Sequence, residues 1–289
     1  MVASIEFIEK TIATCQEAAE ANRQTAGRVG NVVEVPAEAA DEVMVTADLH
    51  GNRTNFNAIR RIADLENHPR RHLVLQEVCH GGPPTPGGGC MSYALLEDVA
   101  KLKTQFPDRI HFIMSNHELA ELTDYPILKA KKMLNVTFRT GMKEMYGLAA
   151  SKVRDSYLEF LRSCPLAVRL PQARVFISHS LPEGADTGRF DATVLDRELT
   201  DDDLGDKGGV FALVWGRDYR LANAAAFAQR VGADQLIHGH DPCPNGYKTP
   251  NEMQIILDCC NDKAHYLIVS ADKKQSHADL VKQIQPLRG

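Results

Sequence analysis

The stretch from Val43 to Asn52 (Val-Met-Val-Thr-Ala-Asp-Leu-His-Gly-Asn) restricts the fold more than any other part of this sequence. Its β-branched, apolar start is typical of a buried strand in a parallel or mixed sheet. Side chains just past the carboxyl end of such a strand lie in the crevice where α/β sheets bind ligands. Asp48 and His50 are two residues apart, so on an extended backbone they point the same way. The stretch predicts a carboxylate and an imidazole offered to a metal ion; the alternative is a chance Asp and His at a strand end.

Strands alternate with helices early in the chain, and strands predominate late. The apolar spacing predicts helices over 3–26, 55–65, 93–105, 119–134, 141–161 and 222–231. Apolar runs predict further strands at 72–75, 109–114, 168–170, 174–178, 235–238, 253–257 and 265–269. This order predicts an α/β fold in which helices flank two packed, mixed β-sheets.

The chain is long enough for one large domain. It has 289 residues, 44% of them hydrophobic, and no Ser/Gly-rich linker divides it. Residues 1–41 are expected to be an N-terminal helix and a connector, and residues 42–289 the main domain. We expect the helix to pack on the main domain; a free-standing interaction helix is the alternative.

Charge and cysteine content limit the partners and the redox environment to be expected for this protein. A net charge of -5 argues against nucleic acid or a membrane surface as a partner. The seven cysteines are odd in number and lack paired two-residue spacings, as expected of reduced intracellular thiols. No apolar run approaches the roughly 20 residues of a membrane span, and residues 1–20 carry four glutamates and no signal-peptide core. A cytoplasmic location is expected.

Several predicted strands end in residues that bind metal ions. These are Asp48 and His50, Glu77, Asn116 and His117, His179, and His238 or His240. Oxygen and imidazole ligands without thiolate suit manganese, iron or zinc. A carboxylate shared between two ions and flanked by histidines is what a two-metal hydrolytic site needs. The other histidines are left to core or surface roles, and the acidic run 201–203 to solvated surface.

The order of four short motifs resembles the calcineurin-like metallophosphoesterases. The motifs are Asp-Leu-His-Gly-Asn at 48–52, Ser-Asn-His-Glu at 115–118, Ile-Ser-His at 177–179 and Gly-His-Asp-Pro at 239–242. More narrowly, the chain is similar to the serine/threonine phosphoprotein phosphatases, including bacterial and phage members. Phe-Pro-Asp-Arg at 106–109, Cys-Pro-Leu-Ala at 164–167 and Val-Trp-Gly-Arg at 214–217 extend the resemblance, which covers roughly residues 42–260.

The resemblance implies a role for each site residue and two divalent metal ions, manganese first and iron or zinc as alternatives. Asp48 and His50 would hold the first ion, and Glu77 would bridge both ions together with a hydroxide. The second ion would be completed by Asn116, His179 and His240. His117 would protonate the departing alkoxide. Phosphate oxygens would be bound by Arg217 with Asn116, and Arg53 and Arg220 are weaker candidates.

The second motif departs from the family pattern. The family has Gly-Asp, a spacer and Val-Asp-Arg-Gly, whereas this chain has Gln-Glu-Val-Cys-His-Gly-Gly at 76–82. Glu77 replaces the bridging aspartate and adds one methylene. His80 stands where the family has the aspartate that orients the general-acid histidine, and Gly81 stands where it has an arginine. We expect His80 to be a defect, an additional metal ligand or a proton donor in its own right.

A loop of Gly and Pro at 81–89 follows this altered motif. Its backbone amides could replace the missing arginine at the mouth of the site, or the loop could be plain flexible surface.

The resemblance implies a metal-dependent phosphatase that acts on phosphoserine and phosphothreonine in proteins. Two alternatives remain open: a hydrolase of dinucleotide polyphosphates or phosphodiesters, and a weakly active member that binds metal and phosphate in a regulatory role. The choice of substrate is expected to depend on residues 119–150 and 181–213.

Overall fold

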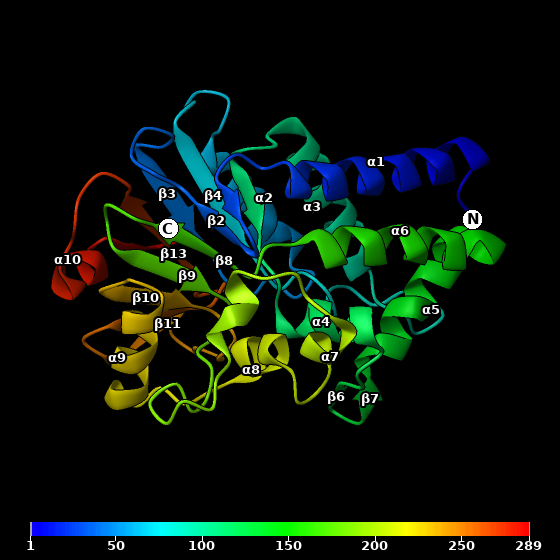
Figure 1. Ribbon diagram of the computed structural model, residues 1–289. Coiled ribbons are helices and arrows are strands. Elements are labelled where there is room, and N and C mark those ends of the chain that lie inside the picture. Colours follow the sequence, from blue (N-terminus) through cyan, green and yellow to red (C-terminus); the bar gives the residue numbers. More distant parts are fainter. Residues whose placement is uncertain (1, 289) are drawn as a thin grey trace.

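Two packed, mixed β-sheets form the centre of the molecule in the computed structural model, which describes residues 2–288 (Figure 1). The seven-stranded sheet has, in order, β1 (Arg28–Val29), β2 (Val32–Glu34), β8 (Ala167–Leu170), β9 (Val175–Ser178), β10 (Gln235–His238), β12 (Gln254–Leu257) and β11 (Tyr247–Asn251). The five-stranded sheet has β14 (Ile284–Pro286), β13 (His265–Ser270), β3 (Glu42–Val45), β4 (Arg71–Leu75) and β5 (Ile110–Phe112). The predicted two-sheet α/β architecture is confirmed.

Parallel pairing brings the ends of distant strands to one edge. Strands β3, β4 and β5 run parallel, with Val45 opposite Val74 and Leu75 opposite Phe112. Strands β9 and β10 of the other sheet are also parallel. The loops that follow β3 and β10, one from each sheet, are joined across the sandwich, since the His240 amide donates to Asp48 Oδ1 (2.9 Å). Except for His238, which is the last residue of β10, the predicted ligand residues lie in or just beyond the loops that follow these parallel strands.

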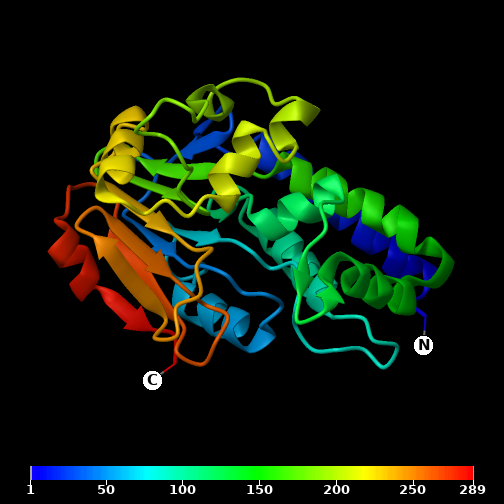
Figure 2. The same ribbon diagram turned by 90° about the horizontal axis from the view of Figure 1, so that it is seen from below.

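Helices cover the sheets on their outer sides and form a lobe at the N-terminal end (Figure 2). In that lobe α1 (Ile5–Arg23) packs against α3 (Ser92–Gln105) and α6 (Ala150–Ser163), beside α5 (Leu134–Tyr146). The buried face of α1 includes Cys15, Ala18 and Ala19, whose small side chains allow close helix packing. The remaining helices are α2 (Arg53–Ala63), α4 (Asn116–Thr123), α7 (Asp201–Leu204), α8 (Gly209–Trp215), α9 (Leu221–Arg230) and α10 (His277–Lys282), with 3₁₀ turns at Gly147–Ala149 and Ala192–Leu195.

The predicted helix over 119–134 is wrong. Helix α4 ends at Thr123, because Asp124 adopts a left-handed conformation (φ 58°) and Pro126 follows. A small hairpin of β6 (Leu128–Lys129) and β7 (Lys132–Met133) takes up the rest of the stretch. The apolar spacing continued through this break, and only the proline signalled it.

Three other expectations also differ from the structure. The helical segment expected at 141–161 is divided between α5 and α6, since Gly147 has a φ of 56°. The expected connector contains β1 and β2, and β2 pairs parallel with β8. Within 201–203, Asp203 is not solvated: it is 8% exposed and forms an ion pair with Arg197 (2.6 Å). In the described part of the chain, no helix combines the length and the apolar character that a membrane crossing requires.

Candidate metal centre

The loop after β3 delivers the first two candidate ligands by a route that differs from the prediction. Strand β3 ends at Val45, and His50 lies in the left-handed region (φ 43°), so Asp48 and His50 are not on an extended backbone. Instead the loop turns around Glu77, whose carbonyl accepts hydrogen bonds from the amides of Leu49 and His50, both 2.9 Å. The two side chains converge because of this turn and not because of strand alternation.

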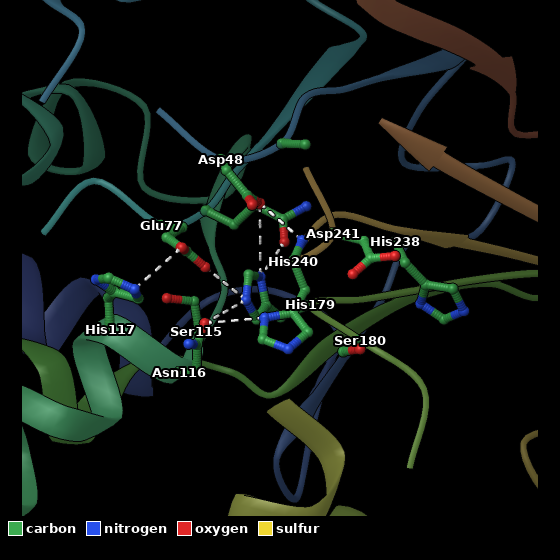
Figure 3. Close-up of polar contacts among 12 residues, drawn as sticks. Asp48, Glu77, Ser115, Asn116, His117, His179, Ser180, His238, His240 and Asp241 are labelled. Carbon is green, nitrogen blue, oxygen red and sulfur yellow. Dashed lines mark hydrogen bonds and ion pairs between the residues drawn. The ribbon is translucent and has the colours of Figure 1, made fainter. Parts of the chain in front are cut away.

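Glu77 lies at the middle of the site (Figure 3). Its Oε1 is 3.0 Å from His50 Nε2 and 3.7 Å from His117 Nε2, and its Oε2 is 2.6 Å from His179 Nε2. The side chain is 2% exposed. Burial alone would raise the pKa of this carboxyl, but the charges of His179, His117 and His50 hold its pKa well below the usual value. The carboxylate is therefore an ionised group that faces ligands on two sides.

His179, Asn116 and His240 gather on one side of Glu77. Asn116 Oδ1 is 2.7 Å from His179 Nε2 and 3.2 Å from His240 Nδ1. His240 Nε2 is buried with no hydrogen-bond partner among residues 2–288. Burial, and then the neighbouring His179, lower the pKa of His240 to about 3, so its ring is neutral and keeps a lone pair for a ligand.

Gln76, which the sequence did not suggest as a functional residue, fixes the orientation of the His179 ring. Its Nε2 donates to the Thr46 carbonyl (2.9 Å), which leaves its Oε1 to accept from His179 Nδ1 (2.7 Å). In the neutral ring the Nε2 lone pair then faces Glu77 and Asn116. The only sequence signal for Gln76 is its place beside Glu77 at the end of β4.

Asp48 lies against the other wall of the site. Its Oδ1 accepts from the His240 amide (2.9 Å) and is 4.0 Å from His179 Nδ1. A Cβ on Gly239 would lie 2.3 Å from this oxygen, so the close approach requires glycine. Burial, and then the charge of Glu77, raise the pKa of Asp48 to about 7.

The arrangement fits divalent cations. His50, Glu77 and His117 form one group whose ligand atoms lie within 4.8 Å of one another, and Glu77, His179 and His240 form a second. Two buried carboxylates and several imidazole nitrogens supply the candidate ligand atoms, and the two groups contain no thiol. Glu77 belongs to both groups, at the position from which one carboxylate can serve two ions.

Neither of two other predicted candidates offers a free nitrogen atom toward this centre. His238 lies in β10, turned away from the centre in Figure 3, with its Nδ1 3.3 Å from the Ser178 carbonyl. His80 is fully buried, and its Nδ1 and Nε2 contact His117 Nδ1 (2.9 Å) and Glu121 Oε1 (3.0 Å). Of the two histidines left open by the sequence, His240 is the one at the centre.

The predicted phosphate-binding arginines lie at different places on the surface. Arg217 is next to the centre: its Nε is 3.0 Å from Asp241 Oδ1, and its Nη2 donates to the His240 carbonyl (3.3 Å), while its side chain is 48% exposed. Arg53, at the start of α2, is paired with Asp98 of α3. Arg220 is held by Asp218 and Asp186.

Gly81 shows why the family's arginine is missing from this motif. Its φ is 90°, and a Cβ there would lie 2.8 Å from the His50 carbonyl oxygen. The Gly/Pro loop that follows is tied to α5, because Gly87 donates to Glu144 (3.0 Å) and the Cys90 amide donates to Thr137 (2.9 Å). The loop is therefore neither plain flexible surface nor, at Gly87, a free amide donor.

Comparisons with known proteins agree with this architecture. The chain is 22% identical over 277 residues to a probable serine/threonine-protein phosphatase of Encephalitozoon cuniculi (strain GB-M1). The match covers 88% of this chain and 55% of the relative, so the chain spans about half the length of the curated relative it matches.

Solved structures share the fold at low identity. A protein serine/threonine phosphatase of Saccharomyces cerevisiae superposes with a TM-score of 0.69 at 13% identity, covering 98% of this chain and 90% of that one. A cold-active protein-tyrosine phosphatase of a psychrophilic Shewanella species gives 0.58 at 12% identity, covering 88% and 80%.

The family model for calcineurin-like phosphoesterases matches residues 42–244, which include every residue of the two ligand groups. That match covers well over half of the chain and confirms the family resemblance seen in its motifs. The chain therefore belongs to the calcineurin-like phosphoesterase family.

Proposed function

We propose that this chain is a phosphoester hydrolase, and more narrowly a protein phosphatase that removes phosphate from phosphoserine and phosphothreonine with two divalent metal ions. The observation that carries the proposal is the position of Glu77, which belongs to both ligand groups. A single carboxylate between two sets of histidines is the donor arrangement that a two-metal hydrolase needs.

The two ions would share Glu77 and differ in their other ligands. Asp48, His50 and Glu77 would hold the first, and Glu77, Asn116, His179 and His240 the second. Oxygen and imidazole ligands favour manganese, with iron and zinc as the other candidates. When bound, such ions supply Lewis-acid activation of a water molecule and neutralise charge on the phosphoryl oxygens.

His117 and Arg217 would act on the substrate directly. His117 lies in the first turn of α4 and is 7% exposed, and its Nε2 lies 3.7 Å from Glu77 Oε1, on the side of the first ligand group. When the ester P–O bond breaks, the leaving alkoxide oxygen needs a proton, and His117, protonated on both ring nitrogens at that stage, would donate the proton on Nε2. Arg217, held beside His240 by Asp241, would bind phosphate oxygens through its planar guanidinium.

One measurement of turnover distinguishes between three kinds of substrate. The purified protein is supplied with Mn²⁺ and offered phosphoserine, phosphothreonine and phosphotyrosine peptides, a dinucleotide polyphosphate and a phosphodiester. We expect the fastest turnover on phosphoserine or phosphothreonine peptides and loss of turnover in EDTA. The dinucleotide as best substrate would favour the alternative hydrolase.

The regulatory alternative predicts a different result. A protein that binds Mn²⁺ and inorganic phosphate but hydrolyses none of these substrates would contradict the proposed activity. Metal content measured on the same sample, at two ions per chain, tests the proposed stoichiometry separately from turnover.

A further inference from the structure

A chain of three buried side chains leads from the general-acid candidate away from the metal centre. His117 Nδ1 is 2.9 Å from His80 Nδ1, and His80 Nε2 is 3.0 Å from Glu121 Oε1. His80 is fully buried, and Glu121 is 1% exposed. We infer that Glu121 positions His117 through His80, so that these two residues together replace the family's single orienting aspartate.

The direction of each hydrogen bond follows from the carboxylate at the end of the chain. A carboxylate can only accept, so His80 Nε2 must carry the proton that Glu121 Oε1 receives. In the neutral form of a ring protonated on Nε2, Nδ1 keeps a lone pair, and the contact with His117 then requires a donor on the other side. His117 Nδ1 therefore donates to His80. The nitrogen of His117 left to exchange a proton with substrate is Nε2, which faces the metal centre.

Two arginines hold the carboxylate in place. Arg139 Nε is 3.4 Å and Arg154 Nη2 is 3.5 Å from Glu121 Oε2, while Oε1 remains for His80. Arg154 also donates to the Glu121 carbonyl (2.9 Å). The negative charge is paired in this way within a buried setting, where an unpaired carboxylate would be costly. Thus Oε1 of Glu121 binds His80, and Oε2 faces the two arginines.

The helix supplies the geometry of this chain. His117 and Glu121 are four residues apart on α4, so they lie on one face, and the His80 ring fits between them. Its ring centroid is 4.9 Å from that of His117 and 5.8 Å from that of Phe138, which packs at its edge. Glu118, the residue next to His117, is engaged elsewhere: it accepts from the amides of Val78 and Cys79. That contact fixes the loop that carries His80.

This inference rests on the proposed role of His117, and it is tested with Glu121→Gln. A glutamine keeps an acceptor for His80 but removes the charge and can turn its amide. We expect kcat on a phosphoserine peptide to fall about tenfold or more, in the range known for partners that orient active-site histidines. The KM should be unchanged, and turnover of an aryl phosphate should change less than about threefold, because its leaving group needs little protonation.

The matched control is Glu97→Gln. Glu97 is also a buried carboxylate, 6% exposed and bound by the hydroxyls of Tyr146 and Tyr157, but it lies in the helical lobe. This variant should leave both substrates unaffected once the folded fraction is matched by thermal melting. If Glu121→Gln slows both substrates equally, or neither, the inference is overturned.

His80→Asp provides a test by rescue. An aspartate at this position places a carboxylate directly beside His117, which makes Glu121 unnecessary. We expect turnover of the phosphoserine peptide within a fewfold of the unsubstituted protein and no further loss when Glu121→Gln is added. A tenfold loss from Glu121→Gln in both backgrounds would contradict the proposed connection.

Ring-nitrogen NMR of ¹⁵N-histidine protein examines the same chain without turnover. The expected tautomers carry the proton on Nε2 of His80 and on Nδ1 of His117, and Glu121→Gln should alter the His80 signals first. A proton on Nδ1 of His80 would overturn the inference alone. Absence of hydrolysis by the unsubstituted protein would instead overturn the proposed function, so the two failures are distinguishable.

Discussion

Two buried pairs of histidines in this molecule have the same hydrogen-bond length but different surroundings. His72 Nδ1 and His111 Nε2 are 2.9 Å apart between β4 and β5, and His80 and His117 are also 2.9 Å apart beside the metal centre. The first pair lies within the five-stranded sheet, and His111 Nδ1 has no hydrogen-bond partner in residues 2–288. The second pair has Glu121 at one end and Glu77 near the other.

The difference shows what allows a buried pair of imidazoles to serve in proton transfer. Burial lowers the pKa of His72 to about 4 and that of His111 well below its usual value, so this pair is neutral and serves only to pack the core. Burial also lowers the pKa of His117, but there the neighbouring carboxylates give the pair a direction and an opening toward substrate. Carboxylates at the ends of the pair, and not burial, distinguish the two.

The largest effect should come from Asp48→Asn, which removes one carboxylate from the centre and leaves both histidine pairs in place. We expect turnover with Mn²⁺ to fall about 10⁴-fold, since a metal ion supplies several kcal/mol of transition-state stabilisation. Steady-state kinetics and metal content check this on the same sample. Full activity in this variant would show that the histidine pair works without the two-metal centre.

The direct comparison of the pairs is His117→Asn against His111→Asn. The first should lower turnover of an alkyl phosphate about 10²-fold, with a smaller loss on an aryl phosphate, because general-acid catalysis is removed. The second should leave turnover per folded molecule unchanged and reduce the free energy of unfolding by about 1–3 kcal/mol, because a buried hydrogen bond is lost. Equal losses on both phosphates would remove His117 from the acid role.

Much of the site could be predicted because it depends on local sequence and on one rule of sheet geometry. Runs of apolar residues ending in Asp48, Glu77, Asn116 and His179 marked strand ends, and parallel strands bring such ends to one edge. The close turn of the loop at His50 could not be predicted in this way, because it is set by the Glu77 carbonyl, 27 positions further along the chain.

Residues that orient the ligands were harder to find. Gln76 and Glu121 are ordinary polar residues in sequence, and their tasks arise from partners 103 and 41 residues away. For Glu121 a weak signal existed, because its four-residue spacing from His117 places both on one helix face. The three expectations for His80, as a defect, an additional metal ligand or a proton donor, did not use this spacing. The end of α4 at Thr123 was also missed, because the apolar spacing continues beyond it.

A smaller effect is expected from Gln76→Leu, which tests orientation by an amide instead of a carboxylate. Leucine cannot accept from His179 Nδ1, so the ring loses the partner that directs Nε2 toward Asn116. We expect the affinity for Mn²⁺ to fall about tenfold, as for other residues that orient metal ligands. Metal titration followed by activity and by calorimetry measures this. Unchanged affinity would mean that Asn116 and Glu77 hold the ring without help.

The smallest effect concerns the pH dependence of stability and the core pair alone. The pKa of His72 is about 4 in the folded protein against about 6.5 when unfolded, so between these values the unfolded chain binds more protons. The contribution of His72 is complete above about pH 6.5 and is lost as the pH falls toward 4. His72→Asn should therefore reduce the slope of unfolding free energy against pH by up to about 1.4 kcal/mol per unit in this window. Equal slopes for the two proteins, measured by urea unfolding, would mean that the core pair takes up a proton while folded, and the contrast between the two pairs would then fail.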